Sequence, residues 1–239
     1  MTGFISGAIT STRKVERRTA LLSACGLLSG GVGFGQPSVQ PVRRILSEIT
    51  LPSPQTTSKL TLEEVLARRR SVRRFAPQAL AVSEIGQLMW AGQGITDAPR
   101  GFRTAPSAGA LYPLELYAVT PYGLYHYVPR GHRLQRLGME DLRRALAKAA
   151  ADQDCVGEAS LDIVVAGVLE RTAVKYGERA EQYILLEAGH AAQNILLEAT
   201  ALGLGGVAIG AMYEDQLAEL LSFPEEEEPL YVLALGHPR

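Results

Sequence analysis

The longest apolar stretch of the chain begins at Tyr183, extends for about 20 residues, and predicts a buried helix about 30 Å long. Its polar residues are spaced three or four apart and form one narrow stripe: Glu187, His190, Asn194 and Glu198. A solvent-facing helix would carry a wider polar stripe, and a membrane span would avoid these charges. We therefore expect a core helix and no integral membrane span.

The helix is predicted to end at Gly203, and the residues from Val207 to Gly210 form a short buried strand after it. A dinucleotide-binding fingerprint requires the opposite order, with a strand first, then the glycines, then a helix. This glycine cluster is therefore not expected to form a Rossmann site.

Other patterns predict shorter elements on both sides of the central helix. A capping box from Thr61 to Glu64 predicts the start of a helix that runs to Arg70, and Ser83 is predicted to cap a second helix. Further elements are expected at residues 114–119 and 124–128 (a hairpin), 140–152 (a helix), 161–168 (a strand buried on both faces), 215–221 (a helix) and 230–235 (a strand).

The order of these elements suggests one folded domain over residues 60–239, preceded by a linker at residues 41–59. Residues 1–40 differ in composition, because a basic segment with adjacent Arg17 and Arg18 precedes a modest apolar run. These features resemble a twin-arginine export signal. A disordered tail or a misassigned start codon would explain them equally, so both an exported (periplasmic) and a cytoplasmic location remain open.

Composition and charge exclude several classes of function. The 239 residues carry a net charge of −1, which gives no general attraction to nucleic acid. The two cysteines lie far apart and the four histidines lack metal-ligand spacing, so we expect neither a disulfide framework nor a metal site.

Two segments have the composition of a ligand site. Arginines and a serine gather between Arg68 and Phe75, where guanidinium groups could bind a phosphate, although a solvated basic face is the simpler alternative. The segment from Ala105 to Pro113 is rich in small residues, which would let a flat ligand approach backbone N–H groups.

Five motifs follow one another along the chain. They are Arg69-Arg70-Ser71-Val72-Arg73, the segment 103–113, Lys175-Tyr176-Gly177-Glu178-Arg179, Glu187-Ala188-Gly189-His190 with Gln193-Asn194, and the segment 201–205. Taken together and in this order, they resemble the nitroreductase-like FMN flavoenzyme superfamily, and within it the SagB-type dehydrogenases. The resemblance covers about residues 60–239.

The resemblance implies an α+β fold with a mainly antiparallel sheet flanked by helices. It also implies a homodimer with FMN at the subunit boundary and the long central helix at the interface. The implied phosphate and ribityl contacts are Arg69, Arg70, Ser71, Arg73 and the terminal Arg239. Pro106, Ser107, Ala108 and Gly109 would cover the isoalloxazine from the partner subunit, and Ile209 and Gly210 would bring a backbone N–H near N5.

In SagB-type enzymes the flavin oxidises an azoline to an azole, and the implied acid/base pair here is Lys175 and Tyr176. Because adjacent helical residues point in different directions, we expect this pair on a loop or an irregular turn. The residues beside the pair, Val174 and Glu181-Gln182, depart from the SagB pattern. An NAD(P)H-dependent reductase of nitro compounds or quinones therefore remains an alternative, and a flavin-binding protein without turnover is a second one.

Overall fold

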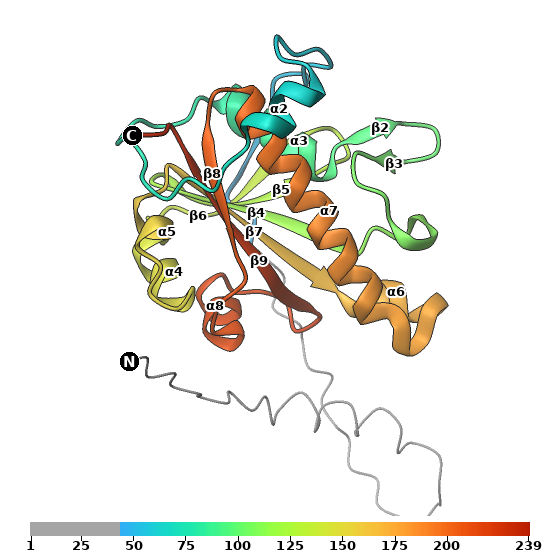
Figure 1. The fold of residues 1–239 in the computed structure, drawn as a ribbon. Coiled ribbons are helices and arrows are strands. Elements are labelled where there is room, and N and C mark those ends of the chain that lie inside the picture. Colours follow the sequence, from blue (N-terminus) through green and yellow to red (C-terminus); the bar gives the residue numbers. More distant parts are fainter. Residues whose placement is uncertain (1–43) are drawn as a thin grey trace, which may run out of the picture. The chain divides into compact units, whose positions relative to one another are not determined.

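The computed structural model describes residues 44–239, which contain one seven-stranded antiparallel sheet (Figure 1). Its strand order is β1-β6-β5-β4-β7-β9-β8. The strands are β1 (Ser47–Thr50), β4 (Leu114–Thr120), β5 (Gly123–Val128), β6 (Arg133–Gly138), β7 (Leu161–Val168), β8 (Gly205–Ile209) and β9 (Glu227–Gly236). A separate small hairpin pairs β2 (Ile95–Asp97) with β3 (Phe102–Arg103).

Helices cover both faces of this sheet, which confirms the expected α+β architecture. The long helices α3 and α7 pack on one face, and α4, α5 and α8 pack on the other (Figure 1). The helices are α2 (Leu62–Arg68), α3 (Val82–Gln93), α4 (Arg143–Ala149), α5 (Asp154–Glu158), α6 (Leu169–Tyr176), α7 (Ala180–Ala201) and α8 (Glu214–Leu220).

Strand β7 lies in the middle of the sheet and is buried along its whole length, as its apolar sequence predicts. Successive side chains of a strand point to opposite faces. Ile163 and Val165 therefore join the core under α7, whereas Val164 and Ala166 join the core under α4, α5 and α8. The apolar residues on both faces of this strand therefore contribute to the hydrophobic cores on both sides of the sheet.

Helix α7 is the predicted central helix, and it has 22 residues. It packs closely against α3 because α3 presents Gly92 at the contact. A β-carbon added to Gly92 would lie 2.9 Å from Cδ1 of Ile195 on α7. The spacing between the two helices therefore depends on the absence of a side chain at this position.

Four details differ from the sequence predictions. Strand β1 pairs with β6, so the sheet includes part of the segment 41–59 that was interpreted as a linker. The capping box of Thr61 is present, but α2 ends at Arg68. Helix α3 begins after Ala81, whose N–H donates to Glu84, and not after Ser83.

The helix expected over residues 140–152 is divided into α4 and α5. Ala151 and Asp152 between them both have positive φ, and two consecutive left-handed residues interrupt a right-handed helix. The candidate export signal of residues 1–40 lies outside the described residues. Among the helices that are described, none is long and apolar enough to cross a membrane.

Candidate active site

The arginine segment lies beside the edge strand β8. Ser71 forms a parallel bridge with Gly206, and the Val72 N–H donates to the Gly206 carbonyl at 3.0 Å. The end of the chain joins the same region, because the Arg239 N–H donates to the Arg74 carbonyl at 3.2 Å. One edge of the sheet therefore brings together the predicted phosphate ligands Arg69, Arg70, Ser71, Arg73 and Arg239.

Two glycines allow this segment to lie so close to the sheet. A β-carbon on Gly205 would lie 2.8 Å from Cβ of Val72, and one on Gly236 would lie 3.1 Å from Cδ1 of Phe75. Contacts below about 3.0 Å force neighbouring atoms to move. The apolar residues Val72 and Phe75 thus anchor the segment, while the alternate arginines remain toward solvent.

The charges of this segment suit a phosphate. Arg73 is exposed and Arg69 is half-buried, and among the described residues no carboxylate forms an ion pair with either side chain. Arg70 Nη1 instead donates to the carbonyls of Ala67 and Arg69 at 2.9 and 2.8 Å. Uncompensated guanidinium groups next to a serine hydroxyl are a donor set that fits a dianionic phosphate.

Gly210 lies on the same edge, immediately after β8. It is exposed, and its N–H lies beyond the last β8–β9 pair, which joins Ile209 to Val232. Gly210 lies four residue positions after Gly206, or roughly 13 Å along the strand at about 3.3 Å per residue. A ligand that contacts both Ser71 and Gly210 must therefore be elongated, which fits a flavin mononucleotide.

The loop of residues 105–113 forms a second group with the Lys-Tyr pair. Gly109 has a φ of +63°, and a β-carbon built on it would lie 3.0 Å from both Lys175 Nζ and Tyr176 Oη. The loop backbone therefore lies against both side chains. Pro106 and Gly109 are exposed, so this backbone presents an open surface to a ligand.

The expectation that Lys175 and Tyr176 lie on a loop is wrong. They are the last two residues of α6, and Gly177, with a φ of +53°, ends the helix. Tyr176 packs edge-on against Tyr183, with ring centroids 4.9 Å apart, and Lys175 Nζ lies 5.5 Å from the centre of the Tyr176 ring. Because both side chains come from the end of the helix, both can reach Gly109 despite their adjacent positions.

The two groups lie apart in one chain. In Figure 1, α6 lies at one end of the 22-residue helix α7 and β8 lies near its other end. Within one chain, the edge that carries the predicted phosphate ligands and the loop predicted to cover the ring therefore lie at different places.

The polar stripe of α7 faces α3 and the beginning of this loop. Asn194 Nδ2 donates to the Thr104 carbonyl at 3.3 Å, and Glu198 lies close to Gln87 of α3. Burial raises the pKa of Glu198 above its usual value, and the Gln87 hydrogen bond partly offsets this effect. The stripe is thus an internal polar seam between two helices, except at the exposed His190.

In the sequence, Glu187 belongs to this polar stripe and to the Glu187-Ala188-Gly189-His190 motif. In the structure it is the most deeply buried acid beside the loop. Glu187 is 2% exposed, and Ser107 of the loop lies close enough to affect the pKa of its carboxyl. Burial raises the pKa of Glu187 to about 7, against weaker opposing effects from the Ser107 hydrogen bond and the Arg103 charge. The sequence feature that could have indicated this burial is a carboxyl within an otherwise apolar helix.

A chain of ionic contacts lies on the other side of the loop. Arg171 Nη2 lies 2.6 Å from Glu115 Oε1, and His126 Nε2 lies 2.7 Å from Glu115 Oε2. Burial alone would raise the pKa of Glu115, but hydrogen bonds and charge from His126 and Arg171 outweigh it and hold the pKa below its usual value. Arg171 also donates to the Tyr112 carbonyl at 3.3 Å, which fixes the end of the loop.

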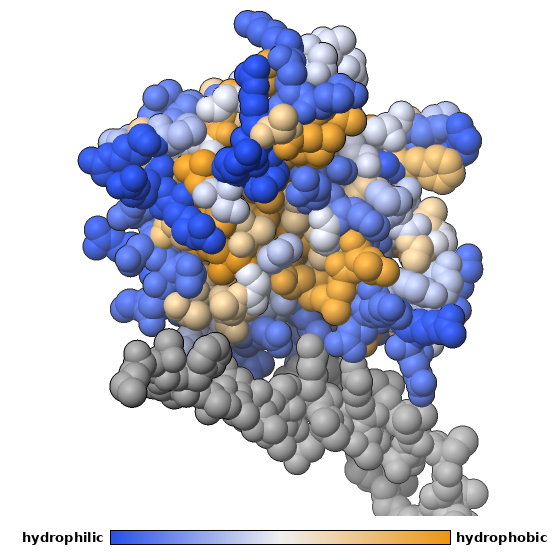
Figure 2. All heavy atoms as spheres, viewed as in Figure 1, coloured by the Kyte–Doolittle hydropathy of each residue, from blue (hydrophilic) through white to orange (hydrophobic). Residues whose placement is uncertain are grey.

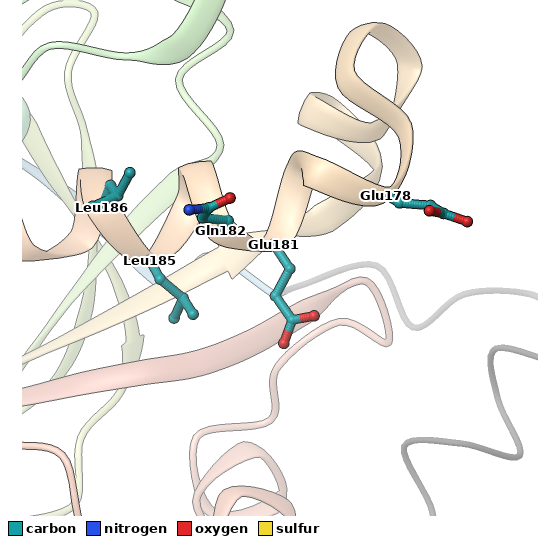
Figure 3. A pocket seen from close by; sticks show the side chains of 5 residues that line it. All are labelled: Glu178, Glu181, Gln182, Leu185 and Leu186. Atoms are coloured by element: carbon teal, nitrogen blue, oxygen red, sulfur yellow. The ribbon is translucent and has the colours of Figure 1, made fainter.

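An open pocket of about 430 Å³ lies along the first turns of α7 (Figure 3). It is lined by Glu178, Glu181, Gln182, Leu185 and Leu186. Glu181 and Leu185 project from the same side of the helix in Figure 3. The pocket contains none of the predicted flavin ligands, so it is a feature of the helix surface and not part of the phosphate-binding edge.

Comparison with known proteins places this geometry in context. The sequence profile of the nitroreductase family matches residues 66–237. A Methanocaldococcus jannaschii protein described as a nitroreductase is 40% identical over 195 residues, which cover 79% of this chain and 96% of that protein. The crystal structure of a Ralstonia eutropha protein with the same description superposes with a TM-score of 0.74 at 35% identity, covering 80% of this chain and 90% of that chain.

Two more distant similarities concern proteins whose names state a function. The NADPH:FMN oxidoreductase of Vibrio harveyi, solved in complex with NAD+, has a TM-score of 0.57 at 25% identity, covering 74% of this chain and 68% of that chain. The microcin B17-processing protein McbC of Escherichia coli is 26% identical over 148 residues, which cover 56% of this chain and 54% of that protein.

Proposed function

This chain belongs to the nitroreductase family and is an FMN-dependent oxidoreductase, and we propose that two copies of it build each flavin site between them. In one chain the phosphate-binding edge and the ring-covering loop are separate, although a bound flavin needs both. A second copy that supplies the loop to the edge of the first would complete the site.

The proposed flavin contacts follow from the donors present. Arg69, Ser71 and Arg73 hold the phosphate, with Arg70 and Arg239 adjacent, and the N–H of Gly210 faces the reactive edge of the ring. The loop of Pro106, Ser107, Ala108 and Gly109, whose Pro106 and Gly109 are exposed, covers the ring of the partner's flavin. Bound FMN supplies hydride transfer, and the protein supplies position and electrostatics.

The surface of α2 and α7 supports a dimer. Figure 2 shows apolar residues gathered on the face that carries these helices. Leu62 and Leu66 of α2 and Leu185 and Leu186 of α7 are each more than half exposed. Large apolar side chains concentrated on two neighbouring helices are typical of an interface between subunits.

We further propose a dehydrogenase of the SagB type, in which Lys175 and Tyr176 would remove or hold the substrate proton beside the bound FMN. The observation that carries this proposal is the contact of Gly109 with both Lys175 Nζ and Tyr176 Oη. It puts the pair at the surface that would cover the ring. Lys175 is exposed in the single chain, so its burial requires the second copy, the flavin or the substrate. The similarity to McbC favours azoline oxidation as the reaction.

The second candidate is an NAD(P)H-dependent reductase of nitro compounds or quinones. It is favoured by the similarity to the Vibrio harveyi NADPH:FMN oxidoreductase and to the Methanocaldococcus jannaschii protein. In this reaction the Lys-Tyr pair would bind substrate without transferring its proton.

Anaerobic mixing of the FMN-loaded protein with NADH and with NADPH separates the two candidates. The dehydrogenase proposal predicts that the flavin absorbance persists with both nucleotides and bleaches with a peptide azoline. Rapid bleaching by either nucleotide would favour the reductase. Tyr176→Phe and Lys175→Ala should each lower the azoline rate without loss of FMN, and full activity in both variants would refute the acid/base assignment.

A further inference from the structure

The loop of residues 105–113 contains backbone that ordinary side chains rarely adopt. Gly109, Ala110 and Tyr112 have φ values of +63°, +54° and +48°. Glycine takes this left-handed conformation without cost, whereas alanine and tyrosine are strained in it. Strained residues persist only where the surrounding structure holds them, and they are frequent at ligand sites. The conformation of Tyr112 therefore requires contacts that stabilise it.

Tyr112 is held at its two backbone polar atoms, at its hydroxyl and at its ring. Its N–H donates to the Ser107 hydroxyl at 2.9 Å, and its carbonyl accepts from Arg171 Nη1 at 3.3 Å. Its hydroxyl oxygen accepts the Arg103 N–H at 3.2 Å, and the Arg103 guanidinium carbon lies 4.6 Å from the centre of its ring. Contacts from three places in the chain thus converge on one residue.

These contacts join the loop to helix α6. Arg103 ends β3, immediately before the loop, and Arg171 belongs to α6, about one helical turn before Lys175. A tyrosine bound to both arginines therefore fixes the loop relative to the helix that carries the Lys-Tyr pair. On the same loop, a β-carbon built on Gly109 would lie 3.0 Å from Lys175 Nζ.

The two arginines are themselves held in place. Arg171 Nη2 lies 2.6 Å from Glu115 Oε1, and Arg103 Nη1 donates to Gln93 Oε1 at 2.7 Å. Glu115 belongs to β4 of the central sheet, and Gln93 is the last residue of α3 and is 1% exposed. Tyr112 is therefore connected to rigid elements of the same chain on both sides of the loop.

We propose that Tyr112 is a positioning residue that locks the loop of residues 105–113 in the shape that covers the flavin ring and contacts the Lys-Tyr pair. The proposal rests on the proposed placement of FMN under this loop. Tyr112 acts on the ring half of the flavin and not on its phosphate, which is bound by the arginine segment. A loop that is ordered before binding loses less entropy on binding, so the lock raises the affinity for the flavin.

The test compares the dissociation constants of FMN and riboflavin, which share the isoalloxazine ring and differ in the phosphate. Tyr112→Ala keeps the left-handed strain and removes the side-chain contacts that offset it. Both constants should therefore rise by the same factor, at least about tenfold. Tyr112→Phe keeps the aromatic ring and loses one hydrogen bond, so both constants should rise by a smaller factor, about two- to tenfold. Quenching of flavin fluorescence with the full-length apoprotein measures the constants.

Tyr122→Ala is the matched control. Tyr122 is 63% exposed in the turn between β4 and β5, so its replacement should leave both constants unchanged. A purely structural role of Tyr112 would lower the urea midpoint of its variants and leave both constants of the folded protein unchanged, and this result would overturn the proposal. A loss of affinity confined to FMN would also overturn it. If Tyr112→Ala does not fold, unchanged constants in Tyr112→Phe are sufficient to refute it.

Pro106→Trp separates this proposal from the placement of the flavin, because it puts a large side chain on the exposed surface of the loop. If Pro106→Trp weakens flavin binding and the Tyr112 variants do not, the role of Tyr112 is wrong and the placement stands. If neither change affects flavin binding, the flavin does not lie under this loop.

Discussion

Replacing Glu187 by glutamine should change how the stability of the ligand-free protein depends on pH. Glu187 is buried in α7, and its pKa is raised from the ordinary 4.5 to about 7 in the folded protein. A group whose pKa is higher in the folded than in the unfolded state contributes stability that is fully present below the unfolded value. This contribution is lost as the pH rises through the folded value.

The size of the effect follows from the shift. The difference between 4.5 and about 7 corresponds to roughly 3 kcal/mol, at about 1.4 kcal/mol per unit of pKa. Between pH 4.5 and pH 8 the wild type should therefore lose about 3 kcal/mol of unfolding free energy that the Glu187→Gln variant keeps. For a chain of this size, the Tm of the wild type should therefore fall by roughly 6 to 12 °C more than the Tm of the variant between these pH values.

Urea unfolding at the two pH values measures this difference directly, at one fixed protein concentration because a dimer is less stable when dilute. Glu178→Gln is the matched control, since Glu178 is an exposed carboxylate just before α7 and should follow the wild type at both pH values. If the stability of the wild type and of Glu187→Gln depended on pH in the same way, the raised pKa of Glu187 would be refuted.

Three further predictions concern the flavin site and the subunit interface. Arg73→Ala should weaken FMN binding by roughly 10- to 100-fold and leave riboflavin binding unchanged, because a charge-assisted bond to phosphate contributes about 1.5–3 kcal/mol. The control in the same titration is Arg130→Ala, which replaces an exposed arginine remote from the site. Gly109→Ala should lower the unfolding free energy by more than the roughly 1–2 kcal/mol of left-handed strain, because the new β-carbon would also meet Lys175 and Tyr176. Gly101→Ala is the control: Gly101 has a φ of +70° and open space around it, so this variant should show the strain alone. Leu186→Asp should break the proposed dimer into monomers, as measured by size-exclusion chromatography with light scattering, and should abolish FMN binding. An FMN-loaded monomer would contradict the shared site.

The sequence predicted the fold where local patterns and burial agree. The apolar helix around Ala188, the two-sided strand at Ile163 and the capping box at Thr61 all formed as expected, because each pattern encodes its own burial or cap. It misplaced the boundary at Ala151, where two left-handed residues interrupt a helical composition. It also missed β1, because one short edge strand among prolines resembles a linker.

The candidate site was only partly accessible from sequence. Motif order led to the arginine segment and Gly210, and the structure places both on one sheet edge through the Ser71–Gly206 bridge. The burial of Glu187 depends on which residues surround it in space. Ser107 lies 80 positions before it in the sequence, and a single sequence does not reveal that the two are close.

A crystal structure of the protein with FMN tests the central claim most directly. The account predicts a flavin between two subunits, with its phosphate on Arg69 and Arg73, its ring beside the Gly210 N–H, and the loop at Gly109 contributed by the second subunit. A flavin bound within one subunit, or away from the edge formed by Ser71 and Gly206, would contradict it.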